Sequence, residues 1–220
     1  MHLLFVCGAN VSGSAVAERL ARSVLDVWLP ERPGAITVGS AGTSATTGSG
    51  VHPLSRGALH ARGGSSRDFE ARQLTPARLR SADLVLTMTE EQRRVVGVVD
   101  RTARGRTFTV REAVALLVTL PPVVGPLGAD GDAHARTLVR QLTDRRSSRR
   151  TRTGSDDLLD PVGSPPVVHE QVAAQLQGLL LVLLRALVLP EHAAGLWGGR
   201  DAATSPAPAA APSPAVRSVA

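Results

Sequence analysis

The chain has 220 residues, a length that favours one domain with appended segments over two full domains. All 25 basic residues are arginine, and together with 19 acidic residues they give a net charge of +6. A single cysteine excludes a disulfide framework and a zinc cluster built on cysteines. The histidines show no metal-ligand spacing, so we expect no metal and interpret each of them as a surface or structural residue.

The positive charge does not by itself predict nucleic-acid binding. The arginines are spread along the chain, and no aromatic residue interrupts the one dense run, so the stacking part of single-strand recognition is missing. We interpret that run as solvated loop charge; it consists of Arg145, Arg146, Arg149, Arg150 and Arg152.

The chain opens with a predicted strand, a tight loop and a helix. Residues 2–6 are a short apolar run that ends at Cys7 and Gly8, as in a buried strand entering a turn. Apolar residues then recur at helical spacing over residues 14–28, with Ser12 or Ser14 as the expected N-cap.

Further strands and helices alternate along the rest of the chain. Strands are predicted at 35–38, 83–88 and 107–110, and helices at 53–61, 75–80, 89–99, 111–117 and 165–189. Residues 40–51 are rich in Gly, Ser and Thr and are expected to form a loop. This alternation predicts an α/β fold of three layers, with a parallel sheet of about four strands and helices on both faces.

Two segments are expected to lie outside this regular pattern. Residues 121–156 show no clear element and are expected to be a flexible insertion, while the Ala/Pro-rich residues 190–220 are expected to be a disordered tail. The predicted domain therefore covers residues 1–189. Its apolar stretch at 176–189 is short for a bilayer and contains Arg185, which favours a buried helix over a membrane span.

Cys7 is the first candidate for chemistry. It ends a strand and precedes a helix N-terminus, where backbone N–H groups and the helix dipole favour a bound anion. The same surroundings are expected to lower the pKa of a thiol and make the thiolate a nucleophile. The alternative from the residues alone is a small buried structural cysteine.

The sequence around Cys7 resembles a known signature. Residues 7–18, CGANVSGSAVAE, are similar to CxGNxCRSPxAE of the low-molecular-weight protein-tyrosine phosphatases. Four further blocks follow in that family's order: SAGT at 40–43, ARQLT at 71–75, SADLVLTMTEEQ at 81–92 and DLLDPVG at 157–163. Five blocks in order are strong evidence for the family's fold.

The resemblance implies a role for each matching residue. Cys7 matches the nucleophile that forms a phosphocysteine, and Asp160 matches the general acid that protonates the leaving group. Asn10 matches a loop residue in a left-handed turn, Ser14 a hydroxyl that stabilises the thiolate, and Ser40 a hydroxyl that supports the loop. The implied phosphate loop comprises Gly8, Ala9, Asn10, Val11, Ser12, Gly13 and Ser14, and no cofactor is implied.

Several positions depart from the family's pattern. The loop arginine, which binds two phosphate oxygens, falls on Gly13, and removal of one such donor costs on the order of 10²–10³ in rate. The second loop cysteine is Ser12, a histidine near the third block is Phe69, and an aromatic wall after Asp-Pro is Val162. Activity is therefore expected to be weak unless another arginine reaches the anion; the candidates are Arg72, Arg56 and Arg19.

Three functions remain open at this point. The first is dephosphorylation of phosphotyrosine or of another phosphomonoester, on a protein or a small molecule. The second is a catalytically inactive pseudophosphatase that binds an anion or a protein partner, with 121–156 or the tail as contact segments. The third, arsenate reduction, is disfavoured because one cysteine offers no internal thiol relay. A bacterial, cytoplasmic protein without a membrane partner is expected.

Overall fold

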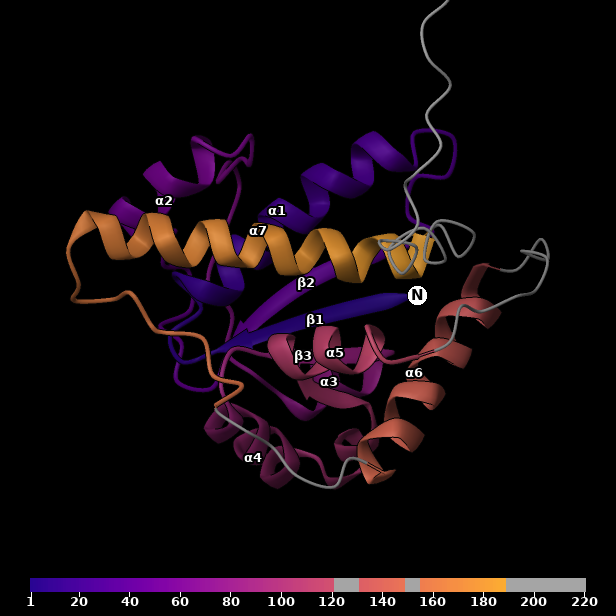
Figure 1. Ribbon diagram of the computed structural model, residues 1–220. Helices are drawn as coiled ribbons and strands as arrows, with labels where there is room; N and C mark the ends of the chain where they lie inside the picture. Colours follow the sequence, from indigo (N-terminus) through magenta and orange to yellow (C-terminus); the bar gives the residue numbers. More distant parts are fainter. Residues whose placement is uncertain (121–130, 149–154, 189–220) are drawn as a thin grey trace, which may run out of the picture.

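The computed structural model describes residues 1–120, 131–148 and 155–188. Four parallel strands form one sheet in the order β2-β1-β3-β4. The central strand β1 (His2–Cys7) lies between β2 (Thr37–Gly42) and β3 (Leu84–Thr87), and the short β4 (Thr107–Thr109) flanks β3. Figure 1 shows the carboxyl ends of these strands directed to one edge, where the loops that follow them gather.

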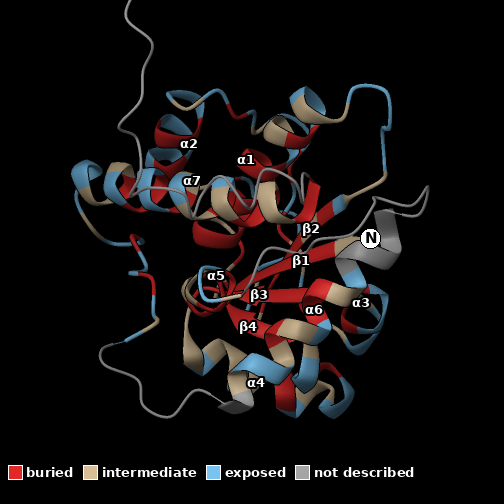
Figure 2. Ribbon diagram, turned by 45° about the vertical axis from the view of Figure 1, so that its right-hand side comes forward, coloured by how far each residue is buried: buried red, intermediate tan, exposed pale blue. Residues whose placement is uncertain are grey.

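Side chains of β1 alternate between two cores. Leu3 and Phe5 point into the larger core, whereas Leu4 and Val6 point into a smaller one on the opposite face. The elements that cover the larger core are α1 (Gly13–Trp28), α2 (Pro53–His60), α5 (Val110–Leu117) and α7 (Pro166–Val188). Those on the smaller core are α3 (Pro76–Ser81), α4 (Glu90–Val99) and the 3-10 turn η1 (Arg101–Arg106). The predicted three-layer α/β fold with a four-stranded parallel sheet is confirmed, and Figure 2 shows the buried strands between exposed helix faces.

Two sequence-based assignments were wrong. Strand β2 does not stop at Val38, as predicted, but continues to Gly42, because its backbone pairs with β1 all the way to Cys7. A helix, α6 (Gly131–Ser148), occupies part of the segment expected to lack regular structure. Its apolar side chains Leu138 and Leu142 are buried in the larger core, so packing stabilises a helix whose overall composition is polar.

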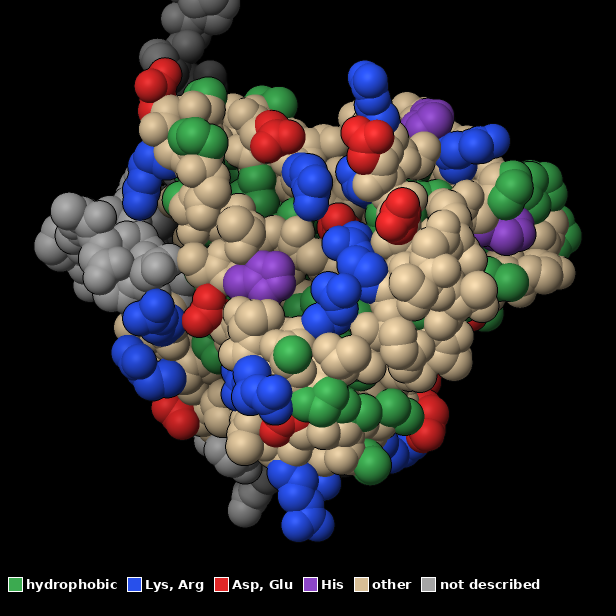
Figure 3. Space-filling view, turned by 180° about the vertical axis from the view of Figure 1, so that it is seen from behind, with side chains coloured by type: hydrophobic (Ala, Val, Ile, Leu, Met, Phe, Trp, Pro, Cys, Tyr) green, Lys and Arg blue, Asp and Glu red, His purple; other side chains and the backbone are tan. Residues whose placement is uncertain are grey.

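The arginine run is not uniformly solvated. Arg146 on α6 is partly buried, with its guanidinium 3.6 Å from the ring centre of Phe108 and its Nε donating to Glu112 at 2.9 Å. Arg145 is exposed, and the rest of the run lies outside the described residues. On the face shown in Figure 3, arginines are scattered with acidic side chains between them and form no continuous stripe.

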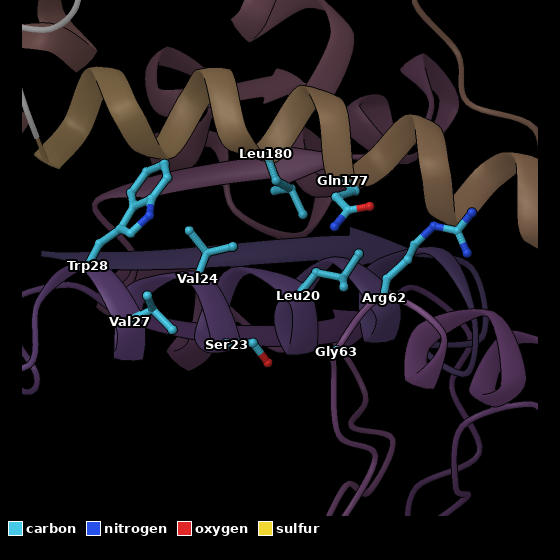
Figure 4. Close-up of a pocket in the computed structure, with 9 residues that line it drawn as sticks. All are labelled: Leu20, Ser23, Val24, Val27, Trp28, Arg62, Gly63, Gln177 and Leu180. Atoms are coloured by element: carbon cyan, nitrogen blue, oxygen red, sulfur yellow. The ribbon is translucent and has the colours of Figure 1, made fainter. Parts of the chain in front are cut away.

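Helix α7 has 23 residues, and by length and composition alone it is apolar enough to cross a membrane. In this fold it is a core helix: it packs on α1, α2 and α5, and half of its most apolar window is buried. A groove of about 260 Å³ remains between α1 and α7. Figure 4 shows Val24, Trp28 and Leu180 lining it, with Arg62 at one end. Arg62 is paired with Glu170 at 2.6 Å, so this groove offers no free catalytic group among its lining residues.

Candidate active site

Cys7 lies at the carboxyl end of β1, where the chain enters the Cys7 loop, defined as residues 7–14. The residue is buried, with an exposed fraction of 7%. Cys7 pairs with Gly42 of β2, where an added Cβ would lie 2.4 Å from the carbonyl oxygen of Gly8. Glycine is therefore required at position 42 for the loop to lie so close to the end of β2.

Two polar groups contact the Cys7 sulfur. The Ser14 hydroxyl lies 2.9 Å from Sγ, and the N–H of Asn10 donates to Sγ at 3.3 Å. Both come from the loop or from the first turn of α1, so the strand–loop–helix arrangement itself positions them. In the described structure, the N–H groups of Gly8, Ala9, Val11 and Gly13 have no protein acceptor, which leaves them free for an anion.

Burial raises the pKa of the Cys7 thiol above its ordinary value. Hydrogen bonds from the Ser14 side chain and from the N–H groups of Ser14 and Asn10 oppose this effect, and the negative charge of Asp160 adds to it. The sequence-based expectation of a lowered pKa is therefore wrong. The physical reason is that a thiolate here would be desolvated, while Gly13 supplies no cation to offset the cost.

Asn10 connects the Cys7 loop to its surroundings. Its φ of 56° is the left-handed conformation expected at this position. The buried amide Nδ2 donates to the hydroxyls of Ser14 at 2.9 Å and Ser40 at 2.8 Å, and Oδ1 accepts the N–H of Arg72 at 2.8 Å. Because one side chain satisfies three partners on different segments, the loop has a single well-determined position.

The buried carboxylate of Glu18 on α1 engages Arg72. Its Oε2 accepts from the Ser40 hydroxyl at 2.6 Å and from Nη2 of Arg72 at 2.8 Å, while Oε1 accepts from Arg22 at 3.2 Å. Arg72 is thus committed to Glu18 rather than to the Cys7 sulfur. It supports the loop through Ser40 and Asn10, and it does not replace the missing loop arginine.

The other two candidates, Arg19 and Arg56, do not replace the missing loop arginine either. The guanidinium carbon of Arg19 lies 5.2 Å from the centre of the Phe69 ring, and that of Arg72 lies 5.6 Å from the same centre. Phe69, which stands where the family has a histidine, therefore makes cation–π contacts with both arginines. Arg56 is exposed on α2.

Met88 occupies the space beside Gly13. A Cβ added at Gly13 would lie 3.0 Å from Met88 Cγ and 3.9 Å from Cys7 Cβ. The pocket formed by Cys7, Gly13, Met88 and Asp160 with their neighbours has a free volume of about 10 Å³, close to what one water molecule requires. It must widen before a phosphoryl group can enter, and the flexible Met88 side chain is the part best able to move.

Asp160 lines the same pocket as Cys7. Its carboxylate is exposed, and Oδ1 accepts the N–H of Val162 at 3.1 Å, a short-range bond that orients the side chain. The structure therefore brings together the two residues expected to act as nucleophile and general acid, although 153 positions separate Cys7 from Asp160 in the sequence.

The acid loop, residues 155–165, is anchored on its amino-terminal side. The N–H of Leu158 donates to the carbonyl of Met88 at 2.8 Å, and Asp157 accepts the N–H of Glu90 at 2.7 Å at the start of α4. Asp157 is therefore an anchor on the helix N-terminus, where a negative charge is favourable. Met88 contacts the site twice, with its side chain beside Gly13 and its backbone under the acid loop.

Sequence reasoning missed a buried polar cluster behind the loop. His169 stacks on His52, and Ser55 joins His169 to Ser12 of the Cys7 loop. His52 and His169 are 117 positions apart and belong to no local pattern, so no signal in the sequence pairs them.

The comparisons with known proteins agree with this geometry. The sequence model of the family "Low molecular weight phosphotyrosine protein phosphatase" matches residues 2–117. The chain belongs to this family.

The similar proteins found by sequence and by structure are phosphatases. The chain is similar to the protein-arginine-phosphatase of Bacillus subtilis (strain 168), with 30% identity over 149 residues, which is 64% of this chain and 94% of that protein. Among solved structures, a C7S mutant of the YwlE arginine phosphatase with a phosphorylated active-site serine matches with a TM-score of 0.60 and 26% identity, over 85% of this chain and 95% of that one. A low-molecular-weight protein tyrosine phosphatase from Bacillus subtilis matches with a TM-score of 0.60 and 25% identity, over 85% and 97%. The expected family, fold and phosphatase class are thus confirmed.

Proposed function

We propose that this family member dephosphorylates its substrate through Cys7, with slow turnover because Gly13 replaces the loop arginine. The observation that carries the proposal is the position of the Cys7 sulfur, held by Ser14 and Asn10 in a pocket that it shares with Asp160. A nucleophile and an acid that line one small pocket are the two groups that a phosphocysteine mechanism requires.

The reaction proceeds in two steps. The Cys7 thiolate attacks phosphorus, the bond from phosphorus to the leaving group breaks, and Asp160 gives its proton to that leaving group. Water then attacks the phosphocysteine, Asp160 takes a proton from the water, and inorganic phosphate leaves with the thiolate restored. The free N–H groups of the Cys7 loop stabilise the phosphoryl oxygens in both steps.

The substrate we propose is a phosphorylated protein or a small phosphate compound in the cytoplasm. A sequence relative and a solved structure similar to this chain are both named arginine phosphatases, which makes phosphoarginine a substrate to compare with phosphotyrosine. The side chain that follows Asp-Pro is Val162, 45% exposed, so this wall offers no aromatic ring on which a phenol could stack. This wall favours a non-aromatic leaving group.

A second function has one observation in its favour. Because the pocket has only about 10 Å³ of free volume and Met88 lies beside Gly13, a module that binds a protein partner without turnover, or an anion once the pocket has widened, also fits the site. Segment 121–156 and the tail at 190–220 are the sequences we propose as contacts in that case; nucleic acid and membrane are not proposed as partners.

The deciding experiment is hydrolysis of p-nitrophenyl phosphate and of phosphoarginine from about pH 5 to 7, with a Cys7→Ser variant as the control. We expect turnover that depends on Cys7 and is on the order of 10²–10³ below that of an arginine-containing family member. Equal rates for the wild type and Cys7→Ser on both substrates would reject the enzyme. Binding of inorganic phosphate, measured by calorimetry, would then support the binding module.

A further inference from the structure

A chain of buried hydroxyl groups connects the Cys7 loop to α7. Ser12 Oγ lies 2.7 Å from Ser55 Oγ on α2, and Ser55 Oγ lies 2.7 Å from Nδ1 of His169 on α7. The exposed fractions of the three residues are 3%, 2% and 1%. Buried polar groups of this kind are costly unless they are satisfied, so the short bonds fix the loop, α2 and α7 relative to one another.

His52 completes the cluster from another direction. Its ring stacks on His169 with centroids 4.9 Å apart and planes 11° from parallel. Its backbone N–H donates to the carbonyl of Val11 in the Cys7 loop at 2.8 Å. His52 therefore touches both the loop and the ring that reaches the loop through Ser55.

The opposite side of His169 faces the acid loop. The carbonyls of Ser164 and Pro161 and the charge of Asp160 all raise the pKa of the imidazole, which places the ring beside this loop. Nε2 of His169 is buried and, within the described residues, has no hydrogen bond of standard geometry. One side chain thus contacts the segment that carries Asp160 and, through two hydroxyls, the loop that carries Cys7.

The cluster favours an uncharged imidazole. Burial is the largest effect on the pKa of His169 and lowers it, and the neighbouring His52 lowers it further. The titratable groups that act on the ring are His52, which stacks on it, and Asp160 from the acid loop. Glu170, the next residue on α7, is paired with Arg62. Protonation would put a charge into this buried stack and reverse the hydrogen-bonding role of one nitrogen.

We propose that His169 is a positioning residue for the reaction at Cys7: its ring is hydrogen-bonded to the Cys7 loop through Ser55 and Ser12, and it lies beside the acid loop. This inference rests on the proposed phosphatase function. It adds a residue that does not touch the substrate, and it gives a role to a buried histidine that is hydrogen-bonded, through Ser55 and Ser12, to the Cys7 loop.

The test compares His169→Phe, which keeps a ring for stacking but cannot bond to Ser55, with His169→Gln, whose amide oxygen can accept from Ser55. The matched control is His60→Gln, an exposed histidine at the end of α2. We expect His169→Phe to lower kcat about 10- to 100-fold with little change in KM, since displacement by about 1 Å costs on this order. His169→Gln should recover part of the loss, and His60→Gln should leave kcat unchanged.

The pH profile separates positioning from a merely structural role. In the wild type, kcat should fall more steeply toward acid at pH values below the ordinary histidine pKa, as His169 is protonated, whereas this additional fall should be absent from His169→Gln. Unchanged kcat and an unchanged acid limb in folded His169→Phe would overturn the inference. If His169→Phe does not fold, Ser55→Ala, which keeps the ring, must show the same loss of kcat.

A second readout keeps the inference distinct from the proposed function. Alkylation of Cys7 by iodoacetamide requires no phosphatase activity and reports the position and ionisation of the thiol. If neither the wild type nor any variant hydrolyses p-nitrophenyl phosphate or phosphoarginine, the proposed function fails. The loop-positioning role then stands only if the alkylation rate changes at least several-fold between the wild type and His169→Phe. Equal alkylation rates would overturn that role as well.

Discussion

A single glycine defines what is unusual about this site. The Cys7 sulfur, Ser14, Asn10 and Asp160 are placed as a thiol-based phosphatase needs, but position 13 offers no guanidinium and the thiol's pKa is raised. The two facts belong together: without a cation, a buried thiol remains protonated near neutral pH, and the transferring phosphoryl group loses its strongest partner.

Gly13→Arg should therefore activate the protein. We expect kcat/KM for p-nitrophenyl phosphate to rise on the order of 10²–10³, because the guanidinium stabilises the transition state. Met88 has to move by a few tenths of an ångström, since its Cγ lies 3.0 Å from the new Cβ. The matched control is Gly13→Gln, which adds bulk without charge.

The same variant should lower the thiol pKa. The rate of Cys7 alkylation as a function of pH measures it directly, and its midpoint should move downward in Gly13→Arg but not in Gly13→Gln. If Gly13→Arg gains no activity although its thiol pKa falls, the small volume of the pocket limits turnover rather than the missing charge. Substitution of Met88 by a smaller residue would then be the next test.

At the scale of elements, the sequence predicted those strands, helices and motifs that are marked by neighbouring residues. The strand before Cys7, the helix after it and the Asp-Pro motif at Asp160 follow from contiguous residues. Strand β2 was placed too short because Ser40–Gly42 has a loop's composition, and pairing with β1 overrides that tendency. Helix α6 was missed because few apolar residues mark its buried face, and the His52–His169 pair was missed because only the tertiary fold brings it together.

One buried carboxylate links helix α6 to α5 and α4, in addition to its apolar packing. Glu112 on α5 accepts from Arg93 on α4 at 3.1 Å and from Arg146 on α6 at 2.9 Å. We expect Glu112→Gln to lower the free energy of unfolding by about 3 kcal/mol, the low end for a broken buried pair, because both guanidiniums remain partly exposed. Urea denaturation measures it.

The control for that change is Glu91→Gln, whose carboxylate pairs with Arg94 at the surface of α4. An exposed pair of this kind contributes at most about 1 kcal/mol. A loss as small in Glu112→Gln as in Glu91→Gln would show that hydrophobic packing of Leu138 and Leu142 holds α6 without the ion pairs.

For the molecule as a whole, the buried histidine makes folding sensitive to acid. The pKa of His169 is lowered in the folded state, so at a pH near 6.5 and just below it the unfolded chain binds more protons than the folded chain. The stability contributed by the neutral ring is complete above about pH 6.5 and is lost as the pH falls toward the folded-state pKa.

Urea midpoints between about pH 5 and 7.5 measure this dependence. The midpoint of the wild type should decrease more steeply toward acid than that of His169→Phe, while His60→Gln should follow the wild type. Parallel curves for the wild type and His169→Phe would mean that His169 does not titrate in this range. The predicted end of the domain at residue 189 stays a prediction. Comparing the urea midpoint of a chain truncated after that residue with that of the full chain tests it.

The packing of α7 against α1 also has a consequence for how the protein is made. Helix α1 packs on β1 and β2 as well, but its apolar face is fully covered only when α7 is available, and the acid loop and His169 arrive only with that last segment. A chain still attached to the ribosome would carry Cys7 from the beginning of synthesis, yet its reactive environment would be assembled at the end. Nascent chains that stop before residue 160 would therefore expose an ordinary thiol to the cell, and release of the complete chain is the step that encloses it.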